Sequence, residues 1–179
     1  MKKFAFVICI LFLFILLPKL NVKGENLDAK DLYNEKIEAM AVFNESNDSI
    51  NVNEEDIYLM SQVVYAESCG EPDNGKLAVA SVILNRARDG RFPKSISGVI
   101  KQRYAFSCVR SGKVIHKGIP NVVPDTASYN AVLDALKGKD PTNKAVFFYN
   151  PEISTSQWMK DIKKTNIKTI GNHVFFVVN

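Results

Sequence analysis

A single carboxylate, Glu67, stands where the sequence changes from a helical pattern to a bend. The bend covers residues 68–75, because Gly70, Pro72 and Gly75 cannot continue a helix and instead favour turns. A carboxylate at the end of a helix, beside a largely apolar neighbouring helix, is placed where desolvation and the helix dipole both favour its neutral form. Glu67 could therefore act as a general acid near neutral pH, although a solvated glutamate at a helix end fits the pattern equally well.

Two predicted helices flank this bend and would position the carboxylate. The first covers residues 54–67, with Asn53 as a favourable N-cap residue and acidic side chains in its first turn. The second covers residues 75–88, and it is apolar around so much of its circumference that we expect it to be buried. Gly90 is expected to end it. The apolar stripe of the first helix consists of Ile57, Met60, Val63 and Val64.

The later part of the sequence predicts shorter elements. Residues 95–102 indicate a short helix, and a clear amphipathic helix runs from Asp125 or Thr126 to Lys137, closed by Gly138. Long helices followed by short strands between loops predict an α+β fold, with helices packed on a small antiparallel sheet. The expected strands are residues 104–109, which alternate like a half-buried strand, their possible partner 113–115, and residues 145–149 and 173–178.

The first 24 residues are expected to be a secretory signal peptide. Lys2 and Lys3 precede an uncharged apolar run over residues 4–17, which is too short to cross a membrane comfortably but suits the hydrophobic region of a signal. An uncleaved N-terminal anchor is the alternative. The protein is therefore expected to be secreted and to act outside the cytoplasm.

Residues 25–53 are expected to form an acidic leader and linker, rich in Asn and Ser, ahead of a catalytic domain over residues 54–179. Within the leader, residues 25–43 show a weak helical periodicity, and residues 44–53 are typical of a flexible linker. The side of the leader helix that would be apolar carries Tyr33, Ile37 and Met40.

The formal net charge of +4 comes entirely from the expected signal segment. That segment holds four lysines and no acid, so the rest of the chain has 19 basic and 19 acidic residues. The expected catalytic domain alone has 17 basic and 12 acidic residues, a net charge of +5. A modest positive field would attract an anionic polymer, although ordinary solubilising charge is an equally simple explanation. No arginine and aromatic pattern favours nucleic acid.

Several motifs occur in the order found in one known family. The opening stretch contains Val64-Tyr65-Ala66-Glu67, Gly70-Glu71-Pro72, Gly75, Ala78-Val79-Ala80 and Val82-Ile83-Leu84-Asn85-Arg86. The middle contains Phe92-Pro93, Ser97-Gly98-Val99-Ile100 and Ala105-Phe106-Ser107-Cys108-Val109. The last third contains Asp134-Ala135-Leu136, Gly138, Asp140-Pro141, Phe147-Phe148-Tyr149-Asn150-Pro151, Thr155-Ser156-Gln157-Trp158 and Ile170-Gly171-Asn172-His173-Val174-Phe175. Over residues 55–176 the chain thus resembles the SleB/CwlJ family of cell-wall hydrolases, the spore-cortex-lytic enzymes.

This resemblance implies a lysozyme-like architecture and lytic action on the bond between N-acetylmuramic acid and N-acetylglucosamine, with Glu67 as the general acid. In the lytic transglycosylase version, Glu67 afterwards acts as a base on the C6 hydroxyl of the muramic acid, which gives a 1,6-anhydro product without water. One carboxylate then suffices. The other nearby acids are Glu71 and Asp73, and a hydrolytic muramidase that uses Glu71 as its second carboxylate is the rival mechanism. Otherwise Glu71 is expected to brace the bend or to bind substrate.

Other side chains could line a sugar-binding cleft, where aromatic faces pack against pyranose rings and amides bind N-acetyl groups. Core packing is the commoner role for residues such as Phe106 and Tyr149, and a structural role is the commoner one for His173. Asn85 and Arg86 could brace the Glu67 bend or bind glycan. The candidate substrate-binding residues are Glu71, Phe106, Ser107, Tyr149, Asn150, Trp158 and His173.

Two other classes of function remain open at this point. Cys69, Cys108 and His173, with Asn172 adjacent, are the ingredients of a Cys/His peptidase that would cut the peptide stems of the wall. Neither cysteine occupies the helix N-terminus that activates thiolates, and the two could instead form a disulfide outside the membrane. A non-catalytic wall-binding module is the third class, and it would be expected to lack Glu67.

Peptidoglycan glycan strands are the expected partner, and no cofactor is expected. The two histidines and the two cysteines beyond the signal are too scattered for a recognisable metal site, while calcium held by oxygen ligands stays open. We expect no separate wall-binding domain. Targeting would then come from the catalytic cleft, from a regulatory or targeting protein, or from a retained anchor.

Overall fold

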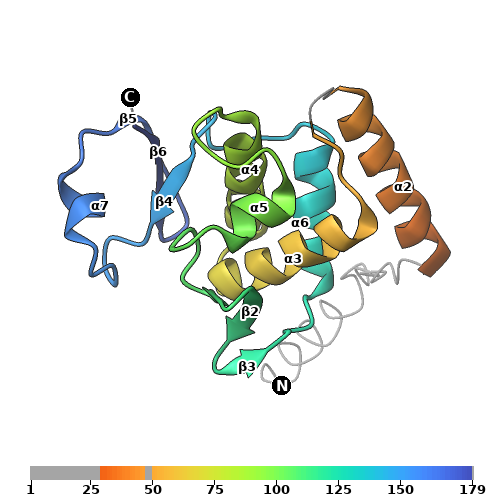
Figure 1. The fold of residues 1–179 in the computed structure, drawn as a ribbon, viewed down its shortest axis with the longest axis horizontal. Helices are drawn as coiled ribbons and strands as arrows, with labels where there is room; N and C mark the ends of the chain where they lie inside the picture. Colours follow the sequence, from red (N-terminus) through yellow and green to blue (C-terminus); the bar gives the residue numbers. More distant parts are fainter. Residues whose placement is uncertain (1–28, 47–49, 179) are drawn as a thin grey trace, which may run out of the picture.

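A computed structural model describes residues 29–46 and 50–178. Its helices are α2 (Ala29–Glu45), α3 (Glu54–Ser68), α4 (Asp73–Arg88), α5 (Ile96–Lys101), α6 (Thr126–Leu136) and α7 (Gln157–Asp161). Its strands are β1 (Val109–Arg110), β2 (Lys113–His116), β3 (Ile119–Pro120), β4 (Phe147–Tyr149), β5 (Thr165–Ile170) and β6 (His173–Val177) (Figure 1). Helices with small antiparallel sheets confirm the predicted α+β class.

Helix α4 lies at the centre of the molecule and packs against α3, α5 and α6 (Figure 1). Most of its residues are buried, as its apolar circumference predicts. It begins at Asp73, slightly earlier than expected, with Pro72 at the N-cap. It ends at Arg88, as predicted, and the backbone N–H of Asp89 caps it there by donating to the carbonyls of Asn85 and Arg86, directly before Gly90.

Helix α3 starts with a complete capping box, which is the local reason for its position. The side chain of Asn53 accepts a hydrogen bond from the N–H of Asp56 at 2.9 Å, and the Asp56 carboxylate accepts one from the N–H of Asn53 at 3.3 Å. The predicted stripe of Ile57, Met60, Val63 and Val64 is fully buried. This buried stripe fixes α3 against α4 and α6, so that the C-terminal end of α3 has one orientation.

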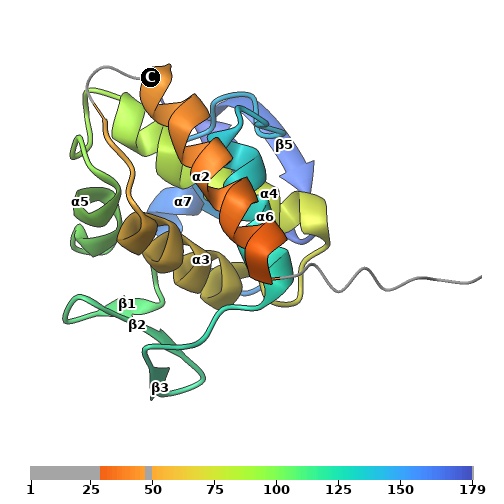
Figure 2. The same ribbon diagram turned by 90° about the vertical axis from the view of Figure 1, so that its right-hand side faces the viewer.

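Helix α2 lies across α6 on the side of the molecule away from the β4–β6–β5 sheet (Figures 1 and 2). Its buried residues are Ala39 and Phe43, whereas Tyr33 and Ile37 are 53% and 40% exposed, so the predicted apolar side was right only at Met40, which packs against the core. The helical pattern was too weak to fix the buried face, which is set by the contact with α6. An ion pair of 3.1 Å between Lys137 and Glu35 adds to this contact.

The expectation of a flexible linker is corrected at the residues that flank the undescribed positions 47–49. The side chain of Asn44 donates to the carbonyl of Val52 at 3.1 Å and accepts from its N–H at 2.8 Å. Ile50 and Val52 are only 3% and 2% exposed, because they belong to the main hydrophobic core. The predicted signal over residues 1–24 lies outside the described residues.

Two three-stranded antiparallel sheets complete the fold, with strand orders β1-β2-β3 and β4-β6-β5. The predicted strand over residues 104–109 is wrong, because only Val109 and Arg110 pair with β2. Tyr104 has a φ of +64°, and the chain turns there. The N–H of Cys108, which a strand would use for pairing, instead donates to Glu67. The other three predicted strands lie within one or two residues of β2, β4 and β6, whereas β3 and β5 were not predicted.

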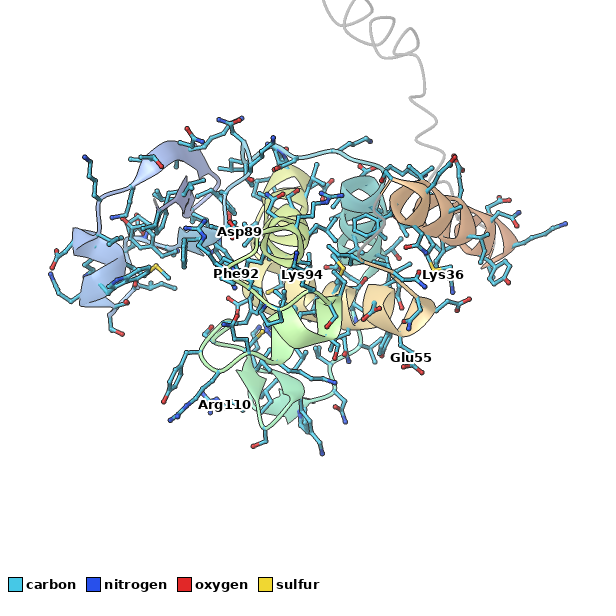
Figure 3. The ribbon with its side chains drawn as sticks, turned by 45° about the horizontal axis from the view of Figure 1, so that its top comes forward. Lys36, Glu55, Asp89, Phe92, Lys94 and Arg110 are labelled. Atoms are coloured by element: carbon cyan, nitrogen blue, oxygen red, sulfur yellow. The ribbon has the colours of Figure 1, made fainter. Side chains whose placement is uncertain are left out.

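The β4–β6–β5 sheet is joined to the helices by aromatic and cation contacts. Phe92 lies in the loop after α4 (Figure 3). Its ring contacts that of Phe147 in β4, with centroids 6.0 Å apart. The same loop carries Asp89 and Arg91, which form an ion pair of 2.7 Å. None of the described helices is both long and apolar enough to cross a lipid bilayer.

Candidate active site

A cavity of about 500 Å³ lies between the end of α3, the turn over residues 104–107, strand β4 and the loop over residues 150–156. These segments are far apart in the sequence and meet only in the folded chain. Six of the eight predicted site residues line the cavity: Glu67, Phe106, Ser107, Tyr149, Asn150 and His173. The other two, Glu71 and Trp158, lie outside its lining.

Glu67 is half-buried and is held by one of its two carboxyl oxygens. Its Oε1 accepts a hydrogen bond from the hydroxyl of Ser107 at 3.1 Å and another from the N–H of Cys108 at 3.0 Å. Within residues 29–46 and 50–178, no hydrogen bond reaches Oε2. In the same part of the chain, Glu67 is the only Asp or Glu that lines the cavity. The carboxyl group is thus oriented by the 104–108 turn and leaves one oxygen for a ligand.

Arg86 lines the cavity from the middle of the molecule, although sequence reasoning left its role between bracing and glycan binding. It is only 4% exposed, and its Nε and Nη1 donate to the carbonyls of Val146 at 2.7 Å and Ala105 at 3.2 Å. The guanidinium also lies 4.9 Å from the ring centroid of Phe106. Burial lowers the pKa of Arg86 to about 10, and the nearby charge of Glu67 opposes this shift. The group therefore stays cationic at neutral pH.

Asn85, the neighbour of Arg86 in the sequence, has a bracing position instead. Its side-chain amide donates to the carboxylate of Asp140 at 3.0 Å and to the carbonyl of Ala145 at 3.1 Å. These bonds tie α4 to the loop before β4. Of the two residues, only Arg86 reaches the cavity.

Glu71 faces away from the cavity and braces the bend between α3 and α4 against the turn between β5 and β6. Its Oε2 accepts from the backbone N–H of Asn172 at 2.9 Å, and its Oε1 accepts from the Asn172 side-chain amide at 2.9 Å. The Glu71 side chain is 7% exposed. These contacts match the expected bracing role. Because Glu71 is not in the cavity lining and both its oxygens are bound, they do not support the predicted contact with substrate or a role as second catalytic carboxylate.

His173 lines the cavity from the start of β6, and the residue is only 8% exposed. The Nδ1 atom is buried without a hydrogen bond from the described residues and lies 3.7 Å from Oε1 of Glu71. Burial lowers the pKa of His173, and the charges of Glu71 and Glu67 oppose this to a smaller extent. The imidazole is therefore neutral at neutral pH.

The predicted aromatic contacts divide between the cavity and its surroundings. Phe106 is 4% exposed and combines a core position with a place in the lining. Tyr149 lies at the end of β4, with its ring edge-on to Phe176 at 6.0 Å. Trp158 is 49% exposed, but it packs edge-on against Phe147 at 5.3 Å, outside the cavity. Its predicted contact with a sugar in this cavity is therefore not supported.

Sequence reasoning missed several cavity residues on loops. Tyr104 is 86% exposed at the rim, and Arg103 donates a hydrogen bond of 2.6 Å to its hydroxyl. The facing loop contributes Ile153, which is 77% exposed. Large exposed apolar side chains beside a cavity are a signal of binding, but this exposure is visible only in the folded chain. The other missed lining residues are Ala66, Ala105, Phe148, Ser154, Thr155, Ser156 and Met159.

The cysteines do not assemble into the predicted Cys/His site. The thiol of Cys108 is buried, and its pKa is raised first by desolvation and then by the charge of Glu67, so the thiolate is disfavoured. The exposed Cys69 lies 3.8 Å from Nε2 of His116, and neither of these residues lines the cavity. Asn172, the predicted third member, is bound to Glu71. Both cysteines are free, so the alternative of a disulfide is also not observed.

Metal ligands do not converge in the described part of the chain. Within residues 29–46 and 50–178, no three His, Cys, Asp or Glu side chains come together in a group that could hold a metal ion.

Comparisons with known proteins agree with this geometry. The family model described as Cell Wall Hydrolase matches residues 70–176. A spore cortex-lytic enzyme of Halalkalibacterium halodurans is 43% identical over 123 residues, which cover 69% of this chain and 35% of that protein. The spore cortex-lytic enzyme of Bacillus subtilis is 41% identical over 120 residues, 67% of this chain and 37% of the relative. The chain thus spans well under two thirds of the length of these curated relatives.

Solved structures match nearly over their whole length. The catalytic domain of the Bacillus cereus SleB protein has a TM-score of 0.61 at 41% identity, over 71% of this chain and 93% of that one. The catalytic domain of the germination-specific lytic transglycosylase SleB from Bacillus anthracis has a TM-score of 0.62 at 41% identity, over 70% and 97%. These matches confirm the expected α+β, lysozyme-like domain.

Proposed function

The chain belongs to the cell-wall hydrolase family, and on that premise we propose that it cleaves the glycan strands of peptidoglycan in the spore cortex. Two kinds of similarity support this substrate. The curated relatives are named spore cortex-lytic enzymes, and one solved relative is described as a germination-specific lytic transglycosylase. The proposed reaction is cleavage of the bond between N-acetylmuramic acid and N-acetylglucosamine.

The observation that carries the proposed mechanism is a cavity with one carboxyl group. Glu67 lines the cavity, and Glu71, the nearest acid that could have been its partner, has both oxygens bound to Asn172. A hydrolytic muramidase of the usual kind needs two carboxyl groups on either side of the scissile bond. A lytic transglycosylase needs only one, because the substrate supplies its own nucleophile. The geometry therefore favours the transglycosylase.

In this mechanism Glu67 acts twice. Its Oε2, which accepts no hydrogen bond from the described residues, is the oxygen placed to give a proton to the bridging glycosidic oxygen. The resulting carboxylate then takes the proton of the C6 hydroxyl while that oxygen bonds to C1 of the same muramic acid. The products are a 1,6-anhydro end and a free N-acetylglucosamine end. No water is consumed.

Neighbouring groups support these two steps. The Ser107 hydroxyl and the Cys108 N–H keep Oε1 in place, so that Oε2 keeps its direction toward the cavity. The buried cation of Arg86 lies in the same lining and stabilises the negative charge that appears on Glu67 after proton transfer. Tyr149 and Asn150, at the end of β4, are placed to contact a sugar. Action at the wall or cortex agrees with the predicted signal segment and with the positive charge of residues 54–179.

The decisive experiment digests purified spore cortex with the protein and identifies the products by mass spectrometry. Anhydromuramic ends are expected. Reducing muramic ends would replace the transglycosylase with a hydrolytic muramidase, and freed stem peptides would favour the Cys/His peptidase. Parallel digests of vegetative peptidoglycan test whether the cortex is the preferred substrate.

A matched set of variants separates the classes. Glu67→Gln should abolish glycan cleavage, whereas Cys69→Ser and Cys108→Ser should retain it. Retention of cleavage by Glu67→Gln would contradict the proposed role of this residue. Loss of cleavage in a well-folded Cys69→Ser variant would point to thiol chemistry instead.

A further inference from the structure

The proposed mechanism leaves one pair of buried polar groups without a task, namely Glu71 and His173. Glu71 is held with unusual closeness. Gly171 has a φ of +57°, and a Cβ at this position would lie 1.9 Å from Oε2 of Glu71. A Cβ at Gly75 would lie 2.9 Å from the Cβ of Glu71. Two glycines and the two hydrogen bonds from Asn172 therefore enclose this carboxylate in one position.

The imidazole of His173 is fixed just as closely. Its ring stands edge-on to Phe148, with centroids 5.3 Å apart and an interplanar angle of 85°, and edge-on to Phe175 at 6.2 Å and 68°. Of its two nitrogens, Nδ1 is the fully buried one and lies 3.7 Å from Oε1 of Glu71. Nε2 is not enclosed in this way and accepts or donates no hydrogen bond within the described residues. Since His173 lines the cavity, Nε2 is the nitrogen that a bound sugar can reach.

The position of the carboxylate decides which nitrogen carries the hydrogen. A lone pair on Nδ1 would face the lone pairs of Oε1, and two acceptors opposed in a buried site repel one another. An N–H on Nδ1 points its positive end at the carboxylate and is favoured. A neutral imidazole with its hydrogen on Nδ1 carries a lone pair on Nε2. In metal sites, likewise, a carboxylate accepts a hydrogen bond from one ring nitrogen of a histidine and so fixes the tautomer that presents the other nitrogen to the metal.

The ring must also be neutral for this lone pair to exist. Burial lowers the pKa of His173, and Glu71 and Glu67 oppose that shift as the two negative groups that act on it. The cavity lining adds the Arg86 cation from α4 and the Tyr149 hydroxyl from β4. Desolvation is the largest of the contributions acting on the ring, so His173 is uncharged at neutral pH.

We propose that Glu71 is a positioning residue that fixes the Nδ1–H tautomer of His173, so that Nε2 accepts a hydrogen bond from a hydroxyl or amide N–H of the bound glycan. The identity of the ligand, a glycan, rests on the proposed function, whereas the Nδ1–H tautomer of His173 does not. In this proposal His173 is a hydrogen-bond acceptor for the substrate. Glu71 acts on the substrate only through His173 and does not contact it. This positioning role also explains why a carboxylate outside the cavity lining is enclosed by two glycines.

The first test is nitrogen NMR of the histidine rings and needs no activity. The chain has two histidines, His116 and His173, so a His116→Gln variant assigns both sets of signals. At pH 7.5 the expected pattern for His173 is a protonated Nδ1 and an unprotonated Nε2. In Glu71→Gln the preference should weaken toward a mixture of tautomers, and the titration of His173 should move to lower pH because a negative neighbour is gone. A protonated Nε2 in the unchanged protein, or no change in Glu71→Gln, would overturn the proposal.

The second test asks whether the glycan uses this acceptor. The probe is an N-acetylglucosamine–N-acetylmuramic acid tetrasaccharide, added to the Glu67→Gln variant so that it binds without being cleaved. The Nε2 signal of His173 should shift on binding, while the Nε2 signal of His116 should not. An unchanged His173 signal at saturating probe would overturn the acceptor role while leaving the glycan-cleaving function intact.

Kinetics add a readout that a purely structural role would not give. His173→Phe keeps a flat ring but no nitrogen, and kcat/KM should fall about tenfold, as expected for one lost hydrogen bond to substrate. His173→Gln carries a side-chain amide of similar reach and should recover part of this loss. The fall in kcat/KM should be smaller for Glu71→Gln than for His173→Phe. Equal losses in His173→Phe and His173→Gln, with unchanged thermal unfolding of both, would contradict the proposal.

Discussion

Glu67 and Glu71 lie four residues apart, at the end of α3 and in the bend that follows it, and the fold treats them in opposite ways. Glu67 keeps one oxygen free and faces the cavity, whereas Glu71 has both oxygens bound to Asn172 and is enclosed by glycines. Both carboxyl groups have protein donors. The difference is how many acceptor sites the protein leaves open, and this difference separates a group that can take part in proton transfer from one that holds structure.

The two regions also differ in what holds them. The Glu67 side depends on a turn over residues 104–108 whose N–H and hydroxyl groups point at one carboxyl oxygen. The Glu71 side depends on backbone shape, because Gly171 occupies a left-handed conformation that other residues adopt at a cost. A substitution on the first side should therefore change activity more than stability. A substitution on the second side should do the reverse.

The largest expected effect is on the Glu67 side. Glu67→Gln removes the one Asp or Glu that lines the cavity among residues 29–46 and 50–178, and the rate of glycan cleavage should fall by about 10²- to 10⁴-fold. Its free energy of unfolding should change little, because a glutamine oxygen can still accept the bonds from Ser107 and Cys108. The release of soluble products from cortex measures the rate of cleavage, and urea denaturation measures the free energy of unfolding. A loss of activity in Glu71→Gln as large as that in Glu67→Gln would erase the contrast between the two carboxylates.

The next effect is on stability and belongs to the Glu71 side. Gly171→Ala places a Cβ against Oε2 of Glu71 at a φ of +57°, and we expect it to lower the free energy of unfolding by about 2–3 kcal/mol. Gly70→Ala is the control in the bend that carries Glu71, since a Cβ there meets nothing within 4 Å. Urea denaturation compares the two. Equal stability of both variants would show that the enclosure of Glu71 is looser than described here.

A smaller effect sharpens the account of how Glu67 is oriented. Ser107→Ala removes one of the two hydrogen bonds to Oε1, and the bond from the Cys108 N–H remains. Activity should fall several-fold, corresponding to about 1 kcal/mol, with little loss of stability since Ser107 is exposed. Steady-state kinetics with a soluble glycan substrate measures this. An unchanged kcat would show that the Cys108 amide alone is enough to hold the carboxyl group.

The smallest effect is a dependence of stability on pH that originates beside Glu71. The pKa of His173 is lowered in the folded chain relative to its ordinary value of 6.5, so the unfolded chain binds more protons between the two values. The His173 contribution to stability is therefore fully present above pH 6.5 and is lost as the pH falls toward the lowered value. Chemical denaturation between pH 7.5 and pH 5 should show this loss. His173→Phe should show a shallower dependence over the same range, and an identical one would contradict the assignment.

Much of the fold was predictable because local rules decide it. The capping box at Asn53, the stripe of α3, the apolar circumference of α4 and the glycine stop at Gly138 are all readable from neighbours in the sequence. The face of α2 was not readable, because its apolar residues occur on more than one side and the contact with α6 chooses between them.

The failure at residues 104–109 has a specific cause that bears on the site. Alternating side chains there resemble a strand, but the period-two pattern does not show that the Cys108 amide will serve Glu67, which is 41 residues away in the sequence. Arg86 was named as bracing the Glu67 bend or binding glycan, but its burial and its place in the cavity lining appear only in the folded chain.

The sequence by itself determined helices α3 to α6, the α+β class, the position of Glu67 before a bend, and the order of motifs that marks the family. Only the tertiary structure decided which carboxylate lines the cavity, that Nδ1 of His173 is buried beside Glu71, and that Trp158 stays outside the lining. The physical reason is the distance along the sequence over which each feature is determined. Helix starts, stops and apolar stripes depend on residues within a few positions, whereas the state of a carboxyl group depends on donors that the fold brings from distant segments.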